Sequence, residues 1–447
     1  MTTAIKPRER DAILQSLRAG VVPRIGLKHI QVGRRDEVAA ILSDLDRATQ
    51  GTATVRFIIG RFGAGKSFFL NLARMVALEK KFVVVSADVT PDRRLHASGG
   101  QARALYSELM RNLAVRSKPE GGALSSVIER WVSDLEHEVR QAGGDDAAVC
   151  RAIQERLKPL QDLVSGYDFA TAISKYFEGY LNQNEALMAS ALRWLRAEYS
   201  TKTQAREELG VRSIIDDQGV YDYLKLMAAF VRMAGYSGLL VSLDEMGVLS
   251  HRLNNSQARN SNYEAILRIL NDCLQGGVEG ACFLFGGTDA FLEDRRRGLF
   301  SYEALATRLA DNTFARDGLK DMSGPVIRLS NLSPEDLFVL LHNIRHVFAS
   351  GDPAKYLVDD GAIKAFMANC AKTLGADYFA TPRDSVKAYV GFLSILEQNP
   401  DTDWRMLLDR TTFDQTTDPE AGPSVETEKE SIGRVPLAED DLATFKL

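Results

Sequence analysis

Residues 60–67 decide the fold, and they are Gly60-Arg61-Phe62-Gly63-Ala64-Gly65-Lys66-Ser67. They match the phosphate-binding pattern G-x-x-x-x-G-K-[ST] at every fixed position. Residues 55–59 before them are β-forming and apolar, and residues 68–78 after them have apolar side chains at helical spacing. The glycines let backbone N–H groups point at phosphate oxygens, and the helix N-terminus adds partial positive charge. The sequence therefore predicts a strand, a phosphate-binding loop and a helix, because a chance glycine loop would lack this context.

The same loop predicts how a nucleotide is held. The Lys66 ammonium can reach the β- and γ-phosphates, and the Ser67 hydroxyl can ligate Mg²⁺. The other expected contacts come from the loop and from the first helical turn: Gly60, Gly63, Ala64, Gly65 and Phe68. ATP and Mg²⁺ are the expected cofactors.

A second candidate stretch ends in two carboxylates. Apolar residues 239–243 lead into Asp244 and Glu245, and carboxylates at the end of a buried strand are costly without partners. Beside a phosphate-binding loop, Asp244 would hold Mg²⁺ and Glu245 would polarise the attacking water. Without that loop, a helix cap would be the better interpretation. The pair favours hydrolysis over phosphoryl transfer, which needs a place for an acceptor hydroxyl.

Composition limits the class of protein. The chain has 447 residues, so two or three domains are expected. A formal net charge of −5 argues against coating nucleic acid by bulk charge. The four cysteines form no C-x-x-C pair, which predicts neither a zinc site nor a disulfide framework. Without a signal sequence or a long apolar run, we expect a cytoplasmic protein with no membrane span.

Strand and helix patterns alternate along most of the chain. Expected strands are 55–59, 82–88, 238–245, 281–289 and 325–329, which favours an α/β fold around a parallel sheet. The expected domains are an N-terminal helical segment (1–50), a core (51–330) with a helical insertion at about 120–215, an all-helical domain (331–410) and an acidic tail (411–447). Ser333 as N-cap with Pro334 at N1 marks the start of the all-helical domain. The tail composition is typical of disorder.

Together these features resemble an AAA+ ATPase of the initiator and helicase-loader-like branch. The resemblance implies a P-loop AAA+ parallel sheet with helices on both faces and a C-terminal helical lid. It also implies an adenine pocket at the Val-Gly-Arg-x-x-Glu stretch, where Ile30, Gln31 and Val32 are the candidates. An ordinary helix cap is the alternative interpretation there.

The AAA+ resemblance further implies residues that sense the γ-phosphate. Thr288 is the candidate sensor 1, with Asp289 second, and either could instead cap the following helix. Arg383, in Thr381-Pro-Arg-Asp, is the candidate sensor 2 of the lid. A solvated arginine in the first turn of a helix is the alternative, although that end is unfavourable for a cation.

An arginine finger would come from Arg308 or Arg316, and surface ion pairs are the alternative for both. A neighbouring subunit that supplies such an arginine can change the rate by ~10³–10⁵. An ATP-dependent homo-oligomer is therefore an expectation that the sequence leaves open.

Four stretches resemble the BREX-associated ATP-binding proteins of the BrxD type over roughly residues 10–400. They are residues 18–27 (RAGVVPRIGL), 60–70 (GRFGAGKSFFL), 95–102 (LHASGGQA) and 301–305 (SYEAL). The resemblance implies a bacterial anti-phage protein that acts with other defence-system components. The initiator branch usually appends a DNA-reading domain after the lid, but only about 50 residues follow Leu396 here and most have the composition of disorder, which puts autonomous, sequence-specific DNA binding in doubt.

Local basic clusters at Arg93, Arg94 and residues 295–297 could contact DNA phosphates, although a solvated face is the more ordinary interpretation. Two functions thus stay open, and a phosphotransferase that uses the same loop is a third, less favoured alternative. One is an ATPase that remodels a defence complex, and the other is a nucleotide-switched scaffold with negligible turnover.

Overall fold

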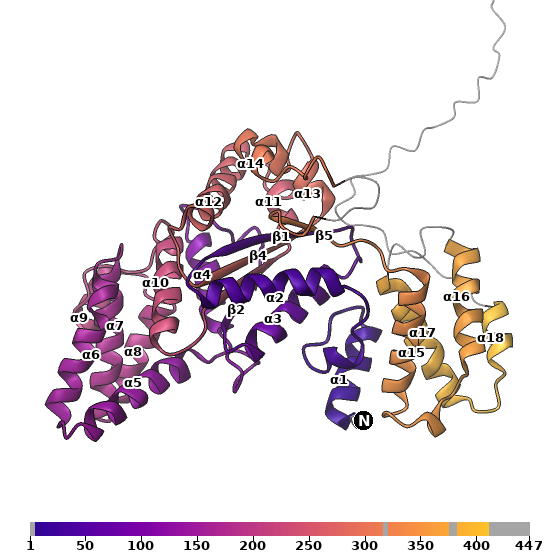
Figure 1. The fold of residues 1–447 in the computed structure, drawn as a ribbon, viewed down its shortest axis with the longest axis horizontal. Helices are drawn as coiled ribbons and strands as arrows, with labels where there is room; N and C mark the ends of the chain where they lie inside the picture. Colours follow the sequence, from indigo (N-terminus) through magenta and orange to yellow (C-terminus); the bar gives the residue numbers. More distant parts are fainter. Residues whose placement is uncertain (1–4, 316–320, 375–381, 411–447) are drawn as a thin grey trace, which may run out of the picture. The chain divides into compact units, whose positions relative to one another are not determined.

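A parallel β-sheet forms the centre of the fold in the computed structural model, which describes residues 5–315, 321–374 and 382–410 (Figure 1). Its strand order is β2-β3-β4-β1-β5, and each of these strand pairs is parallel. The strands are β1 (Thr54–Ile59), β2 (Val83–Asp88), β3 (Leu239–Asp244), β4 (Ala281–Gly287) and β5 (Val326–Arg328). The mixed α/β class and all five expected strands are confirmed, with ends that differ by one or two residues.

Each face of the sheet packs against its own set of helices. Along β1, Phe57 and Ile59 point into the larger core, while Ile58 points to the other face, as the two-residue period of a strand requires. The second face is covered by α2 (Arg35–Thr49) and α3 (Lys66–Glu79). The larger core is formed with α4 (Gln101–Arg111), α10 (Val220–Met233) and α12 (Ser256–Gln275). The strands are buried on both faces, which explains their continuous apolar runs.

The expected insertion is a group of helices between α4 and α10. These are α5 (Leu124–Gln141), α6 (Asp146–Gln161), α7 (Gly166–Leu181), α8 (Glu185–Leu195) and α9 (Lys202–Leu209). The ring of Phe230 on α10 meets Trp131 of α5 at 5.5 Å and Phe169 of α7 at 6.2 Å between centroids. The insertion therefore shares one apolar core with the sheet.

Short elements connect the remaining strands at the upper part of Figure 1. They are α11 (Gly247–His251), α13 (Asp289–Glu293), η2 (Leu299–Ser301) and α14 (Glu303–Arg308). Of the helices that the structure describes, none has the length and apolar character that a bilayer span requires.

The C-terminal helices are α15 (Pro334–Phe348), η3 (Pro353–Lys355), α16 (Asp360–Leu374), α17 (Pro382–Gln398) and α18 (Trp404–Arg410). The Asp336 N–H donates to the Ser333 hydroxyl at 3.1 Å, which confirms the predicted helix start. The N-terminal α1 (Pro7–Arg18) packs on α15 and α17, and η1 (Leu27–His29) packs on α15. The division into domains stays a prediction, and the acidic tail lies outside the described residues.

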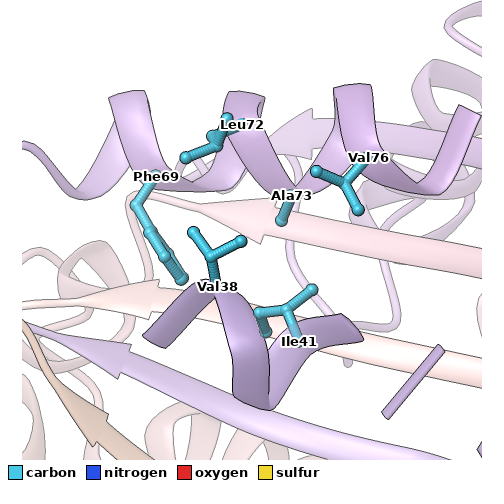
Figure 2. Close-up of a pocket in the computed structure, with 6 residues that line it drawn as sticks. All are labelled: Val38, Ile41, Phe69, Leu72, Ala73 and Val76. Carbon is cyan, nitrogen blue, oxygen red and sulfur yellow. The ribbon is translucent and has the colours of Figure 1, made fainter. Parts of the chain in front are cut away.

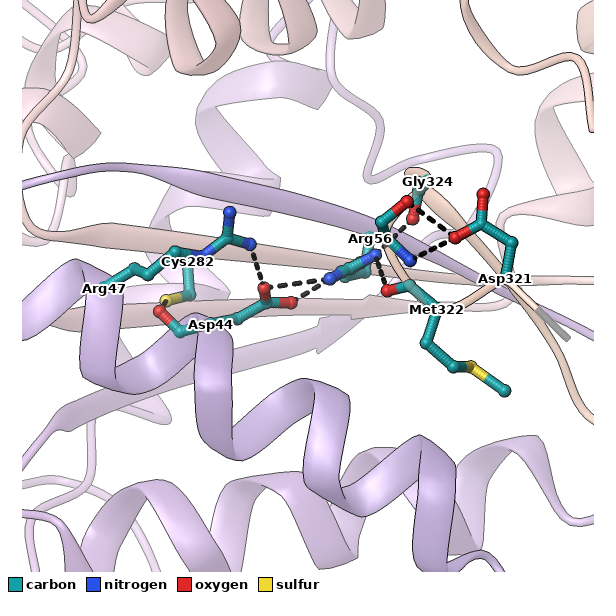
Figure 3. A network of polar contacts seen from close by, with 8 residues as sticks. Asp44, Arg47, Arg56, Cys282, Asp321, Met322 and Gly324 are labelled. Carbon is teal, nitrogen blue, oxygen red and sulfur yellow. Dashed lines mark hydrogen bonds and ion pairs between the residues drawn. The ribbon is translucent and has the colours of Figure 1, made fainter. Parts of the chain in front are cut away.

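A buried ion pair joins α2 to the sheet (Figure 3). Arg56, on β1, donates to both carboxylate oxygens of Asp44 on α2, at 2.5 and 2.9 Å. Its third nitrogen donates to the backbone carbonyls of Met322, at 2.9 Å, and Gly324. Because these carbonyls precede β5, one guanidinium fixes α2, β1 and β5 together.

Candidate functional site

The loop at residues 60–67, here called the glycine loop, joins β1 to α3. Gly63 and Gly65 have φ values of 78° and 90°, a left-handed conformation that glycine adopts without steric cost. The Lys66 ammonium donates to the carbonyls of Gly60 and Arg61, each at 3.0 Å. The lysine therefore closes the loop on itself, at the start of α3.

Asp244 meets the glycine loop across a neighbouring strand. The Ser67 hydroxyl donates to its carboxylate Oδ2 at 2.6 Å, although β4 lies between β1 and β3 in the sheet. Gly286 on β4 makes this possible, because a Cβ built there would be 2.5 Å from Asp244 Oδ1 and 2.8 Å from Leu70. The sequence analysis missed Gly286. The feature of the sequence that could have indicated it is the pair of glycines that ends an otherwise apolar strand.

Glu245 follows Asp244 in a strained conformation. Its φ is 57°, and its N–H donates to Asp244 Oδ1 at 2.9 Å. A left-handed conformation in a residue other than glycine costs about 1–3 kcal/mol and is concentrated at functional sites. The turn leaves Glu245 exposed directly beside the carboxylate that contacts Ser67.

Asp88 is a third carboxylate at this edge of the sheet, and the sequence analysis missed it. In the β2–β3 register, Asp88 lies opposite Asp244. Partial burial and then the charge of Asp244 raise the pKa of Asp88, while Arg93 and Arg24 lower it in part. The sequence could have indicated Asp88, because it ends the second predicted strand as Asp244 ends the third.

Arg383, the candidate sensor 2, lies against the glycine loop. Its guanidinium carbon is 5.4 Å from the centre of the Phe62 ring, within the range of a cation–π contact. Its Nε would be 3.0 Å from a Cβ built on Gly20, in the loop that follows α1. The structure thus brings together α17, the glycine loop and the turn at Gly20.

Comparison with known families decides the family of this chain. The family model described as BREX system ATP-binding protein BrxC/D matches residues 5–412. The chain belongs to the BrxC/D family. The resemblance found in the sequence is thereby confirmed, and no curated protein matches the chain. Membership links this BrxC/D chain to phage defence and implies other BREX proteins as partners.

Two other nucleotide candidates in this BrxC/D chain face the C-terminal helices. Ile30 is 2% exposed and packs in one apolar cluster with Ile13, Leu337 and Leu341. Phe68, on the first turn of α3, packs against the same cluster. Gln31 and Val32 are half-buried. The cluster brings the expected adenine-binding segment next to the start of α3, and the pocket itself stays a prediction.

Thr288 directly follows β4, the strand between β1 and β3. Its hydroxyl accepts from the Phe291 N–H at 3.2 Å, so it caps α13. Asp289 pairs with Arg328 at 3.6 Å. The capping interpretation of Thr288 is confirmed, whereas a sensor role is untested.

The candidates for an arginine finger and for DNA contact mostly make ordinary contacts within the chain. Arg308 donates to Asn271 on α12 at 2.8 Å and to the Ala304 carbonyl at 2.8 Å, and Arg316 lies outside the described residues. Arg93 pairs with Glu108 at 3.3 Å. Arg297 donates to carbonyls of residues 251 and 253, so only Arg295 and Arg296 of that cluster are exposed.

A narrow apolar hollow, without room for a water molecule, lies between α2 and α3 (Figure 2). The side chains of Val38 and Ile41 face those of α3 across it: Phe69, Leu72, Ala73 and Val76. No polar group lines it, and nucleotide phosphates need donors or cations. The hollow is therefore a packing seam behind the glycine loop.

The residues at the loop fit a magnesium nucleotide. Mg²⁺ prefers oxygen ligands, keeps several waters and uses one or two carboxylates with substrate phosphates. The Ser67 hydroxyl and the Asp244 carboxylate supply such oxygens. In the described part of the chain no three His, Cys, Asp or Glu side chains gather as a metal site.

Proposed function

We propose that the chain is a P-loop ATPase of the AAA+ type that binds ATP with Mg²⁺ at the glycine loop and hydrolyses it in the bacterial cytoplasm. The observation that carries the proposal is the 2.6 Å contact between Ser67 and Asp244. Two motifs 177 residues apart in the sequence meet at the end of β1 as a Walker A loop and a Walker B acid would.

The chain's own residues divide the work of binding. The N–H groups of the glycine loop and the N-terminus of α3 would hold phosphate oxygens, and Lys66 would turn from the Gly60 and Arg61 carbonyls to the β- and γ-phosphates. Ser67 and Asp244 would hold Mg²⁺, which when bound neutralises charge on the phosphates. The exposed carboxylate of Glu245 would orient a water and accept its proton.

The nucleotide state would be signalled through Arg383. In the structure its guanidinium rests on Phe62 of the glycine loop, so a γ-phosphate would compete with the ring for the same cation. A charge-assisted, bidentate bond to phosphate is stronger than an exposed cation–π contact. Binding of ATP would therefore move α17 and the helices packed on it, and so change assembly with other BREX proteins, on DNA or in an ATP-dependent homo-oligomer.

The test is ATP affinity and phosphate release by the full chain. Lys66→Ala should abolish tight ATP binding and turnover, and Lys387→Ala, a change to an exposed lysine of α17, should leave both unchanged. Wild-type affinity in the Lys66→Ala variant would contradict the assignment of the loop.

A nucleotide-switched scaffold is the second candidate. The observation that favours it is the α13 cap made by the Thr288 hydroxyl, which gives the sensor 1 candidate a structural role. If this candidate holds, wild-type chain binds ATP but releases phosphate no faster than the Lys66→Ala variant, with or without DNA and partner proteins.

A further inference from the structure

Arg34 lies between the glycine loop and two helices, α2, which follows it directly, and α15, which is distant in the sequence. It precedes α2 with φ 62°, a left-handed conformation that a residue other than glycine rarely adopts. Its side chain is 10% exposed, and its Nη2 donates to the carbonyl of Ala64 at 3.2 Å. Such strain in a buried, charged residue points to a role that the surrounding structure enforces.

The bond to Ala64 fixes the direction of the next N–H group. The chain has no cis peptide bond among its described residues, and in a trans peptide unit the C=O and N–H groups point in opposite directions. Since Arg34 fixes the Ala64 carbonyl, the N–H of the next residue, Gly65, points away from the Arg34 side chain. Within the described residues that N–H makes no hydrogen bond.

Two carboxylates accompany the Arg34 charge. Glu37, on the first turn of α2, is 4% exposed and lies 3.7 Å from the guanidinium. Asp336, on the first turn of α15, lies against Gly33, where a Cβ would be 3.3 Å from its Oδ2. Burial lowers the pKa of Arg34, and Glu37 and Asp336 offset that effect in part. The guanidinium is thus surrounded by the loop, α2 and α15.

We propose that Arg34 is a positioning residue that sets the Ala64–Gly65 peptide for phosphate binding and ties that geometry to α15. The inference rests on the proposed function and deepens it. In the proposed function Arg383 would connect the bound nucleotide to α17. Arg34, which precedes α2, would connect the glycine loop to α15. Movement of α15 would then change the direction of a phosphate-binding N–H, and bound phosphate would favour one position of α15.

The test is the affinity for MgATP of matched variants of the full chain. Arg34→Met alone would leave Glu37 as a lone buried charge, so it is combined with Glu37→Gln and compared with Glu37→Gln alone. We expect at least about tenfold weaker binding, the usual effect of losing a hydrogen bond from a charged donor. Arg34→Lys, which keeps a charged donor, should recover most of the affinity.

Arg35→Met is the control, because Arg35 is the neighbouring exposed arginine and its side chain makes no hydrogen bond or ion pair within the described residues. Its affinity should stay within twofold of wild type. A folded Arg34→Met/Glu37→Gln variant that binds MgATP as tightly as Glu37→Gln would overturn the proposal. If Arg34 had only a structural role, the Arg34→Met/Glu37→Gln and Arg34→Lys variants would both have a lower melting temperature. Arg34→Lys would then not recover the affinity for MgATP.

Hydrogen exchange without nucleotide separates this inference from the proposed function. The Leu337 N–H, in the first turn of α15, bonds to the Ser333 carbonyl at 2.9 Å. It should exchange faster in the Arg34→Met/Glu37→Gln variant than in Glu37→Gln, and α5 should not change. Unchanged exchange at Leu337 would contradict the link to α15. If wild-type chain bound no ATP, the proposed function would fail, and this measurement would still decide the link.

Discussion

Asp244 reaches the glycine loop over β4, and the space for its carboxylate comes from one missing side chain. Gly286 lies where a Cβ would meet Asp244 on one side and Leu70 of α3 on the other. The loop, the acid and the helix are therefore packed around a single residue.

Gly286→Ala should lower both stability and MgATP affinity. Overpacking of this kind typically costs about 1–3 kcal/mol, and relief requires Asp244 or α3 to move away from Ser67. Thermal melting and calorimetric titration with MgATP measure the two effects. Gly391→Ala is the control, since a Cβ there has no neighbour within 4 Å. An affinity unchanged by Gly286→Ala would argue that Asp244 does not act with Ser67.

Asp88 predicts a pH dependence. Its raised pKa means that the folded chain binds the proton more tightly than the unfolded chain, so ionisation of Asp88 costs stability as the pH rises above the ordinary value of 3.8. Asp88→Asn should therefore stabilise the nucleotide-free chain at pH 7, and the gain should shrink as the pH falls toward 3.8. Denaturant midpoints across pH measure this. Asp92→Asn, at an exposed site, should show no such trend.

Sequence alone predicts residues whose chemistry fixes their type and spacing. Lys66, Ser67, Asp244 and Glu245 belong to this group, and the structure brings the first three of them together or next to one another. Gly286, Asp88 and Arg34 were missed because their roles depend on which strands and loops become neighbours. Nothing in the local pattern around Arg34 shows that it will bond to Ala64.

At the scale of elements, α10 joins the insertion to the sheet. Its Phe230 is fully buried and contacts aromatic rings of α5 and α7. The expected strands and the helical pattern of residues 124–209 followed from apolar patterns and turn residues. The packing of α1 on α15 and α17 did not, because a pattern along one segment does not show contacts with helices more than 300 residues away.

Phe230→Ala should loosen the insertion from the sheet. Loss of a buried phenylalanine costs about 3–5 kcal/mol, so we expect a lower melting temperature and faster proteolysis within residues 124–209. Phe314→Ala is the control, because Phe314 is 84% exposed and such a change usually stays within about 0.5 kcal/mol. Equal proteolysis of the two variants would contradict a core shared between the insertion and the sheet.

For the whole molecule, the glycine loop and the C-terminal helices are joined through two arginines. The chain belongs to the BREX ATP-binding family, and its glycine loop is contacted by α2, through Arg34, and by α17, through Arg383. Both arginines lie outside the loop: Arg34 directly precedes α2 and follows Gly33, which Asp336 of α15 approaches, and Arg383 lies on α17 itself. A nucleotide at the loop would therefore change the surface that these helices present to a partner.

The most direct test of the central claim is single-turnover hydrolysis by the Glu245→Gln variant. The account predicts that this variant binds MgATP about as tightly as the wild-type chain. It should hydrolyse ATP at least about a hundredfold more slowly, the lower end of what a positioned general base contributes. Wild-type turnover by the Glu245→Gln variant, under conditions in which Lys66→Ala is inactive, would contradict the assignment of Glu245 and with it the proposed mechanism.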